Sequence, residues 1–284
     1  MDIEKIQKEK PISELLEFCI INVDKPAGIT SFVCADKVRR ITGAKKAGHF
    51  GTLDPMVTGV LPVAINRATR LSNYFMKKDK EYIGKMLIHK DISEEELKKE
   101  MKYFLGKIMQ KPPVKSRVKR VLRERNVNCW DIIKKQGKIV EFIADVEAGT
   151  YIRKLISDLG EKIGGSHMIE LRRIRAGMFL EKETRSIDEI EKAFKKYKLG
   201  DESDLRRILI PAEIIDKILT KVYVNEDCIK GLLNGRPLLK KDLIECQNIN
   251  DLERVSVFYK EKFIGVYKIL EDGDIVAKPE FVLN

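Results

Sequence analysis

Apolar and polar positions along the chain follow two different periods, which predicts a mixture of strands and helices. Residues 19–26 (CIINVDKP) are mostly apolar up to a Pro/Gly turn, and residues 81–89 (EYIGKMLIH) alternate, as buried and half-buried strands do. Residues 31–43 instead carry apolar side chains three or four positions apart and end at a glycine, which is typical of a helix. Because these elements do not alternate as regular βαβ units, the predicted fold class is α+β rather than doubly wound.

The same two periods predict the remaining elements of the first two thirds of the chain. A polar arm with one short helix occupies residues 1–18. Further strands are predicted at residues 57–65, 138–149 and 168–180. Further helices are predicted at residues 68–78, 93–107, 151–165 and 187–208, the second of them capped by Ser93 and the third stopped by glycine.

The pattern changes after Pro211, and this change predicts a second domain. From about residue 218 the chain consists of short strand-like runs (KVYV, RVSVFY, FIGVYKI and DIVAKP) separated by turn residues. Short strands at regular spacing favour a small barrel or sandwich. The predicted organisation is an arm at residues 1–20, a larger α+β domain at residues 21–217 and a small β domain at residues 218–284.

Composition narrows the class of protein and of partner. The 284 residues include 55 Lys+Arg and 44 Asp+Glu, a formal net charge of +11, and 43% are hydrophobic, enough for cores. The charged N-terminus does not resemble a secretory signal, no apolar run approaches the roughly 18 residues of a membrane span, and the five scattered cysteines form no CxxC pair. We therefore expect a cytoplasmic protein with no disulfide framework, metal site or membrane contact.

The positive charge is clustered, which makes a polyanion the first partner to consider. Residues 111–125 (KPPVKSRVKRVLRER) contain many basic residues and a single acid, and residues 171–175 (LRRIR) add three arginines. A nucleic acid is favoured over a lipid surface because membrane features are missing. From charge alone, however, an exposed and solvated face explains each cluster equally well.

One loop displays residue types suited to catalysis. The run AGHFGTLDPMVTGVLPVAI, residues 47–65, places His49 and Asp54 among glycines before a strand. Proline at position 55 keeps Asp54 out of the helical region, and glycines allow close approach of a ligand. An aspartate held rigidly on a turn is a candidate catalytic group, although an Asp-Pro turn and a structural histidine remain ordinary alternatives.

The segment GHFGTLDPMVTGVLPV resembles the catalytic motif of the TruB-type pseudouridine synthases. Four further segments resemble the family's other signatures in the same order, so that the likeness spans about residues 11–284: INVDKPAGITSF, KEYIGKM, VEAGTYIRKL and GGSHMIELRRIRAGMF. Within the family, the dyskerin-type H/ACA catalytic subunits are the closer likeness, on three segments: PISELLEFCIINVDKP, LIHKDISEEEL and QKPPVKSRVKRVLRER. The small C-terminal domain resembles a PUA RNA-binding module.

The resemblance implies three catalytic residues. Asp54 matches the nucleophile that attacks the ribose-uracil linkage, so that the base detaches, rotates and rejoins through carbon. Tyr82 matches the tyrosine that stacks on the target base and is placed for proton transfer. Arg153 matches the arginine paired with the aspartate, which keeps the carboxylate ionised and oriented. A carboxylate is a competent nucleophile for an isomerisation, and no cofactor is implied.

The resemblance also implies residues that bind the substrate. Four positions match residues at the substrate site: Lys25, His49, Tyr151 and Leu171. Of these, Leu171 matches a residue that lines the uracil pocket, and Lys25 matches a lysine that supports the active-site loop. Four basic residues match a thumb loop over the RNA: Lys115, Arg117, Lys119 and Arg120. Three arginines are expected to contact the RNA backbone or to form structural pairs: Arg172, Arg173 and Arg175.

The function implied is isomerisation of uridine to pseudouridine in ribosomal RNA by the catalytic subunit of an H/ACA guide-RNA particle. The expected partners are guide RNA, ribosomal RNA, possible tRNA substrates and the small H/ACA core proteins of the zinc-ribbon-like and glycine-arginine-rich-homologue types, with no DNA. A stand-alone tRNA T-loop enzyme and a non-catalytic RNA scaffold remain alternatives. Phe50, Met56 and the short C-terminal domain depart from the family's pattern.

Overall fold

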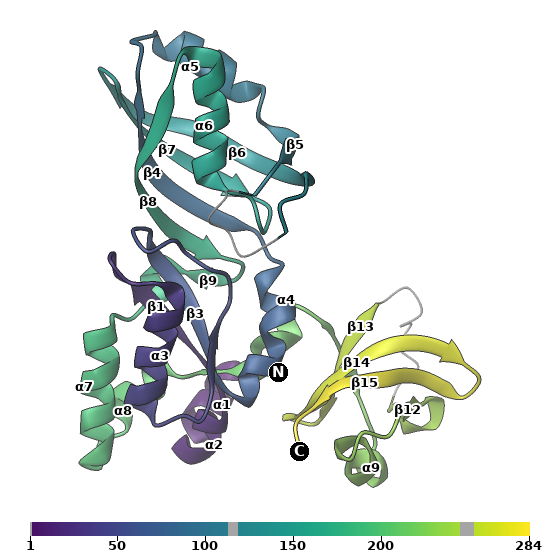
Figure 1. The fold of residues 1–284 in the computed structure, drawn as a ribbon. Coiled ribbons are helices and arrows are strands. Elements are labelled where there is room, and N and C mark those ends of the chain that lie inside the picture. The colour runs from purple at the N-terminus through teal and green to yellow at the C-terminus, as the bar shows by residue number, and fades with distance from the viewer. Residues whose placement is uncertain (1, 113–118, 245–252) are drawn as a thin grey trace.

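The computed structural model describes residues 2–112, 119–244 and 253–284 as two bodies, a large α+β body and a small β body (Figure 1). In Figure 1 the small body, coloured green to yellow, lies beside the end of the large body that carries the N-terminal helices. The predicted α+β fold class with a small C-terminal β domain is confirmed.

Within the described residues, a ten-stranded sheet forms the larger body and mixes parallel with antiparallel pairs. Its main path runs β10-β1-β3-β8-β4-β7-β6-β5, with β2 paired to β3 and β9 to β8. The strands are β1 (Phe18–Lys25), β2 (Ala47–His49), β3 (Thr58–Asn66), β4 (Lys80–Ile88), β5 (Gly106–Gln110), β6 (Arg123–Gln136), β7 (Ile139–Val146), β8 (Ser166–Ala176), β9 (Phe179–Leu180) and β10 (Ile210–Pro211).

Helices cover this sheet in two groups. In Figure 1, α5 and α6 lie against the half of the sheet formed by β4 to β7, whereas α3, α7 and α8 lie beside β1 and β3. The α-helices of the large body are α1 (Ile3–Glu9), α2 (Ile12–Glu17), α3 (Ser31–Thr42), α4 (Ser72–Met76), α5 (Glu94–Lys102), α6 (Ile152–Ile163), α7 (Ile187–Lys198) and α8 (Ser203–Ile208). Helix α9 (Ile229–Leu233) belongs to the small body. Of the helices in the described residues, none is long and apolar enough to cross a membrane.

Local sequence signals explain where several helices begin and end. The Ser93 hydroxyl accepts a hydrogen bond from the main-chain N–H of Glu96 at 3.1 Å, which caps α5 as the sequence predicts. Helix α6 ends at Gly164, whose φ of 86° lies in the left-handed region that glycine adopts most easily. The start of α5 and the end of α6 are therefore set by cap residues that are visible in the sequence.

The N-terminal arm differs from its prediction, because two helices precede the first strand where a polar arm with one short helix was predicted. Helix α1 is held by tertiary contacts that its own sequence does not reveal. The Lys5 ammonium pairs with Glu261 at 3.1 Å, and Lys10 pairs with the buried Glu213 at 2.7 Å. The arm thus connects both bodies of the protein.

A second sheet lies in the small body, with the order β11-β13-β14-β15-β12. Its strands are β11 (Thr220–Tyr223), β12 (Leu238–Leu239), β13 (Arg254–Tyr259), β14 (Lys262–Asp272) and β15 (Ile275–Val282). Aromatic side chains join this sheet to the larger body, because the ring of Phe18 on β1 stacks on Phe263 with centroids 5.3 Å apart and also approaches Phe281. The burial of these rings fixes the small body against the large one.

Candidate active site

The loop that carries Asp54 lies between β2 and β3 and is held against the sheet by buried apolar side chains. Leu53 and Val57 flank Asp54 and belong to the same buried cluster as Tyr82 and Leu171. Asp54 itself is exposed. The loop therefore anchors its apolar residues and leaves the carboxylate accessible.

Lys25 fixes the backbone of this loop through hydrogen bonds of its side chain. Its side chain is fully buried, and the ammonium donates hydrogen bonds to the main-chain oxygens of Pro26 and Pro55 at 2.9 Å and of Val57 at 2.8 Å. Burial lowers the pKa of Lys25. Three carbonyl acceptors use the three N–H groups of the ammonium, so Lys25 acts on the loop and not by direct contact with a substrate.

Two further side chains fix the loop, and sequence reasoning missed the first of them. The buried Ser31 hydroxyl donates to the oxygen of Leu53 at 3.0 Å and accepts from its N–H at 2.8 Å. Arg173 is 1% exposed and donates to the oxygens of Gly51 and Val60 at 3.0 and 2.8 Å. These oxygens lie on either side of Asp54, so Arg173 clasps both ends of the loop.

Asp54 forms an ion pair with Arg153, the second residue of α6. About half of each side chain is exposed, at 49% for Asp54 and 44% for Arg153. A guanidinium favours the ionised carboxylate and orients it. The arrangement thus presents an oriented carboxylate to solvent, as an attacking group requires.

Tyr82 and Leu171 lie on neighbouring strands and belong to the buried cluster that also contains the apolar residues flanking Asp54. Tyr82 on β4 is 8% exposed, and Leu171 on β8 pairs with Gly84 two residues further along β4. A Cβ at Gly84 would lie 2.9 Å from a methyl carbon of Leu171 and 2.6 Å from the ring of Phe142. Glycine therefore leaves the room that Leu171 and Phe142 occupy in this apolar wall.

Two protein-family models match the chain between residues 39 and 215. Residues 39–152 match the model of the "TruB family pseudouridylate synthase (N terminal domain)", and residues 153–215 match the "tRNA pseudouridylate synthase B C-terminal domain". A probable tRNA pseudouridine synthase B of Korarchaeum cryptofilum is 38% identical over 274 residues, covering 94% of this chain and 84% of the relative. A relative of the same description in Nanoarchaeum equitans is 42% identical over 251 residues, covering 87% and 72%.

The chain belongs to the TruB family of pseudouridine synthases. It is accordingly an RNA isomerase. Two solved structures are similar to it: the "Cbf5-Nop10-Gar1 Complex", with a TM-score of 0.89, 34% identity and coverage of 97% of this chain and 88% of that one, and an "H/ACA RNP bound to a substrate RNA containing 2'-deoxyuridine", with values of 0.85, 31%, 98% and 89%.

His49 and Phe50 precede the Asp54 loop, and the first is half-buried whereas the second is fully buried. His49 on β2 pairs with Val63 of β3, and its Nδ1 atom is buried without a partner among the described residues. Burial, together with the Arg173 guanidinium, lowers the pKa of His49 below its usual range, so the imidazole is neutral at pH 7. The neighbouring Phe50 is buried and stacks on Phe75 at 4.7 Å, which is how the packing accommodates an aromatic ring there.

The three arginines of β8 were predicted either to contact the RNA backbone or to form structural pairs, and each of them forms structural pairs. Arg173 is buried in the clasp described above and has no surface for RNA. Arg172 forms a two-pronged pair with Asp24 at 2.9 and 3.0 Å and contacts Glu181, while Arg175 lies 2.7 Å from Asp145 and 3.3 Å from Glu81. Arg172 and Arg175 are partly exposed beside their carboxylate partners, so RNA contact by these two residues stays a prediction.

The predicted thumb residues divide into two pairs. Lys115 and Arg117 lie outside the described residues. Lys119 and Arg120 are exposed, and Arg120 donates to the main-chain oxygen of Pro112 at 3.2 Å. Their position at the edge of the sheet before β6 keeps RNA contact as a prediction.

Tyr151 is the N-cap residue of α6. Arg153, two residues further along the chain, pairs with Asp54. Its N–H and C=O groups are bound by the buried side chain of Gln110 at 2.9 and 3.3 Å. Sequence reasoning missed Gln110 and also Lys80, whose buried ammonium donates to the oxygens of Met76 and Lys78. Gln110 binds main-chain groups 41 residues away, which only the fold brings near, whereas the acceptors of Lys80 are local but no sequence pattern marks them.

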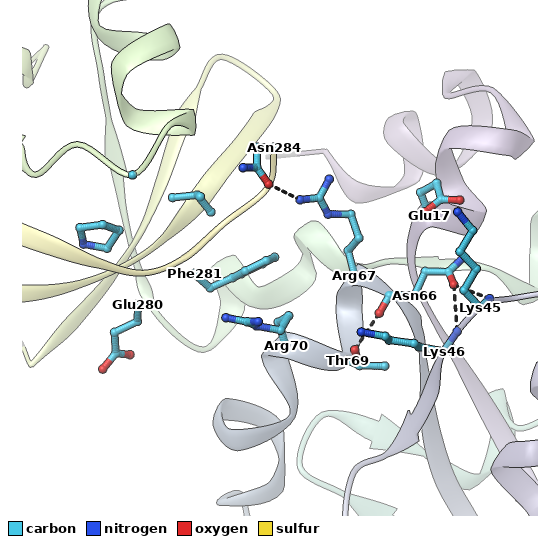
Figure 2. A pocket seen from close by; sticks show the side chains of 13 residues that line it. Glu17, Lys45, Lys46, Asn66, Arg67, Thr69, Arg70, Glu280, Phe281 and Asn284 are labelled. Carbon is cyan, nitrogen blue, oxygen red and sulfur yellow. Dashed lines mark hydrogen bonds between the residues drawn. The ribbon is translucent and has the colours of Figure 1, made fainter.

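A larger basic hollow lies between the two bodies, and two of its residues, Lys45 and Lys46, directly precede β2 in the chain. It has a volume of about 560 Å³, and in Figure 2 Arg67 and Arg70 of the large body point toward the C-terminal strand, while Lys45 and Lys46 line the side of the hollow away from that strand. Arg67 donates to the Asn284 side chain at 2.6 Å. Lys45 and Lys46 are exposed and form no ion pair within the described residues. The hollow therefore presents available positive charge at the junction.

Proposed function

We propose that this chain isomerises uridines of ribosomal RNA to pseudouridine as the catalytic subunit of an H/ACA guide-RNA particle. The observation that carries the proposal is the extent of the likeness to the H/ACA structures, which spans 97% and 98% of this chain and so includes the small C-terminal sheet. The described partners of those relatives, Nop10, Gar1 and a substrate RNA, are the partners we propose here.

In the proposed reaction Asp54 is the nucleophile. The carboxylate attacks the sugar at the ribose-uracil linkage, the base leaves and rotates in the wall formed by Tyr82 and Leu171, and it rejoins through carbon as the bond to Asp54 breaks. Arg153 keeps the carboxylate ionised before the attack. When the base rejoins through carbon, that carbon loses its hydrogen as a proton and the freed ring nitrogen gains one, and Tyr82 is the group proposed for this proton transfer. The reaction requires no redox partner because substrate and product are isomers.

Guide dependence requires two RNA surfaces on one body. Asp54 lies on one, and the hollow that contains Lys45, Lys46 and Arg67 lies between the catalytic body and the C-terminal sheet, which we propose to be the PUA module. Basic side chains without carboxylate partners release counterions from a phosphate backbone when it binds. A guide hairpin held at both surfaces would select the uridine by base pairing, so the protein itself needs to read little sequence.

A stand-alone tRNA T-loop isomerase is the second candidate. The specific observation in its favour is that curated relatives 36–42% identical are described as probable tRNA pseudouridine synthase B. A scaffold without catalysis is disfavoured, because RNA binding alone would not require the exposed Asp54 to be paired with Arg153 and clasped by buried groups.

Tritium release from labelled uridine separates the two enzymes. The purified chain is incubated with a ribosomal RNA fragment, alone and with a matching hairpin guide plus the Nop10- and Gar1-type proteins, and in parallel with a tRNA T-stem-loop. We expect poor activity on the fragment alone and efficient activity at the paired uridine once the guide and proteins are added. A guide with a mismatched pocket is the control and should give no release.

Efficient modification confined to the tRNA T-loop, with no response to the guide, would replace this proposal by the stand-alone enzyme. The variant Lys45→Gln/Lys46→Gln sharpens the result. It should weaken the guided reaction and leave the thermal stability unchanged, because both side chains are exposed and have no partner among the described residues.

A further inference from the structure

A small cavity lies between the end of β5, the start of β6 and the N-terminus of α6. Its volume is about 160 Å³, and it is lined by Gln110, Pro112, Arg123, Arg125, Gly149 and Tyr151. Pockets for drug-sized ligands measure roughly 300–1,000 Å³, so this one accepts a group much smaller than a nucleoside.

The cavity carries positive charge that the protein leaves largely unpaired. Arg123 and Arg125 are two residues apart on β6 and therefore project from the same face of the sheet. The Nε atom of Arg123 is buried and has no hydrogen-bond partner among the described residues, and Arg123 forms no ion pair there. Arg125 donates to the Glu124 main-chain oxygen and lies 3.9 Å from Glu147, a long ion pair. Because the Nε atom of Arg123 is closed to solvent, the donors that an anion can reach are the terminal Nη groups of the two arginines, and those of Arg123 form no hydrogen bond with the described residues.

The walls of the cavity are built to hold these arginines. The Gln110 side chain, 2% exposed, fixes both main-chain groups of Tyr151, and Gln110 also pairs with Arg123 across β5 and β6. Gly149 has a φ of 88°, and a Cβ there would lie 3.1 Å from Nη2 of Arg125. Glycine therefore gives the guanidinium its place. Helix α6 begins beside the cavity with no acid in its first turn, so its dipole adds attraction for an anion.

The cavity is adjacent to the reacting groups. Tyr151 lines it, and Arg153, two residues along the chain and so within about 7 Å between Cα atoms, pairs with Asp54. We propose that this cavity binds one phosphate of the substrate RNA strand next to the target uridine. The proposal rests on the proposed function for the identity of the anion, because two arginine forks and a helix N-terminus select a phosphate whatever its source.

The consequence for the reaction is an anchored backbone. Turning the uridine out of its stack costs on the order of a few kcal/mol, and a phosphate held by Arg123 and Arg125 offsets part of that cost while the base turns toward Asp54. The two arginines are then positioning residues. They hold the strand and do not touch the reacting atoms.

The test neutralises the phosphates one at a time. The full chain is titrated in a filter-binding assay with a tRNA T-stem-loop and with the guided ribosomal fragment, each carrying a single uncharged methylphosphonate linkage placed in turn at positions around the target uridine. Wild-type protein should lose about tenfold in affinity at one linkage. The variant Arg123→Gln/Arg125→Gln should lose about tenfold with unmodified RNA and show no further loss at that linkage.

The matched control is Lys134→Gln/Lys192→Gln, which removes the same charge from two exposed positions on β6 and α7. It should keep the full sensitivity at the linkage. Urea unfolding of the arginine variant should still show one cooperative transition, which establishes that the variant is folded in the binding assay. An identical linkage profile in wild type and the arginine variant would overturn the phosphate site. Absence of tritium release from both RNAs would instead contradict the proposed function, and the binding cycle would still report on the cavity.

Discussion

Arg173 and Arg123 both belong to basic clusters of the sequence, yet their guanidinium groups have opposite surroundings. Arg173 is 1% exposed and donates to two main-chain oxygens of the Asp54 loop. Arg123 lines a cavity and keeps a buried Nε atom without a partner among the described residues. The first arginine holds the protein's own backbone, and the second is available for another molecule's phosphate.

A cluster of basic residues in the sequence therefore does not by itself identify an RNA contact. What matters is whether the N–H groups of a cation already have acceptors. Lys25 and Arg173 donate their N–H groups to main-chain oxygens in and around the Asp54 loop, so they hold the loop in place. Lys45 and Lys46 have no carboxylate partners in the described part of the chain, so they can exchange water and counterions for RNA.

Removing each arginine should separate the two roles most strongly. Arg173→Gln should lower the free energy of unfolding by about 3 kcal/mol or more, because two buried carbonyls lose their donors and a buried side chain is left poorly packed. Arg123→Gln should cost much less unfolding free energy, because no acceptor among the described residues loses a donor, and it should weaken RNA binding. Urea unfolding monitored by circular dichroism measures both. Equal destabilisation by the two variants would break the distinction.

A methyl group at Gly59 should disturb the same clasp by a smaller amount. The φ of Gly59 is 99°, and a Cβ there would lie 2.2 Å from the main-chain oxygen of Arg173. Gly59→Ala combines this overlap with backbone strain and should cost about 2–4 kcal/mol of unfolding free energy.

The matched control for this clash is Gly200→Ala. The φ of Gly200 is 96°, and open space surrounds its Cβ position, so only backbone strain of about 1–2 kcal/mol is expected. If thermal or urea unfolding gave the same loss for both variants, the close approach of Gly59 to Arg173 would not contribute to stability.

The pH dependence of stability tests a third buried cation near the loop. Burial, and then the charge of Arg173, lower the pKa of Lys80 from 10.5 to about 8. Between these two values the unfolded chain holds a proton that the folded protein has released, so this group raises stability as pH increases from about 8 to about 10.5, by up to about 3 kcal/mol. Lys80→Met should remove that rise, which is visible as the difference between the urea unfolding curves of variant and wild type. An unchanged pH profile would contradict the lowered pKa.

The sequence predicts most of the elements because their periodicity and caps are local. Strand β4 and helix α5 lie where alternation and Ser93 place them. Strand β6, with fourteen residues, was not predicted. It begins with Arg123 and Arg125, which belong to a charged run that is typical of a loop. A charged residue on a strand is recognisable only when its neighbour, β5 here, is known.

The candidate site divides in the same way. Asp54, Tyr82, Arg153 and Leu171 follow from the resemblance to the TruB family, and the structure pairs Asp54 with Arg153. The clamps Ser31 and Gln110 could not be predicted, because they bind main-chain groups 22 and 41 residues away. Such contacts leave no spacing in the sequence to detect.

The nucleophile is tested most directly by Asp54→Asn, which keeps the size of the side chain and removes its charge and nucleophilic oxygen. Asp227→Asn, an exposed position in the small body, is the matched control. Tritium release reports isomerisation, and filter binding reports RNA affinity. We predict that Asp54→Asn falls below detection in the first assay and matches wild type in the second, while the control is normal in both. Substantial residual turnover by Asp54→Asn would contradict the assignment of Asp54 as the nucleophile.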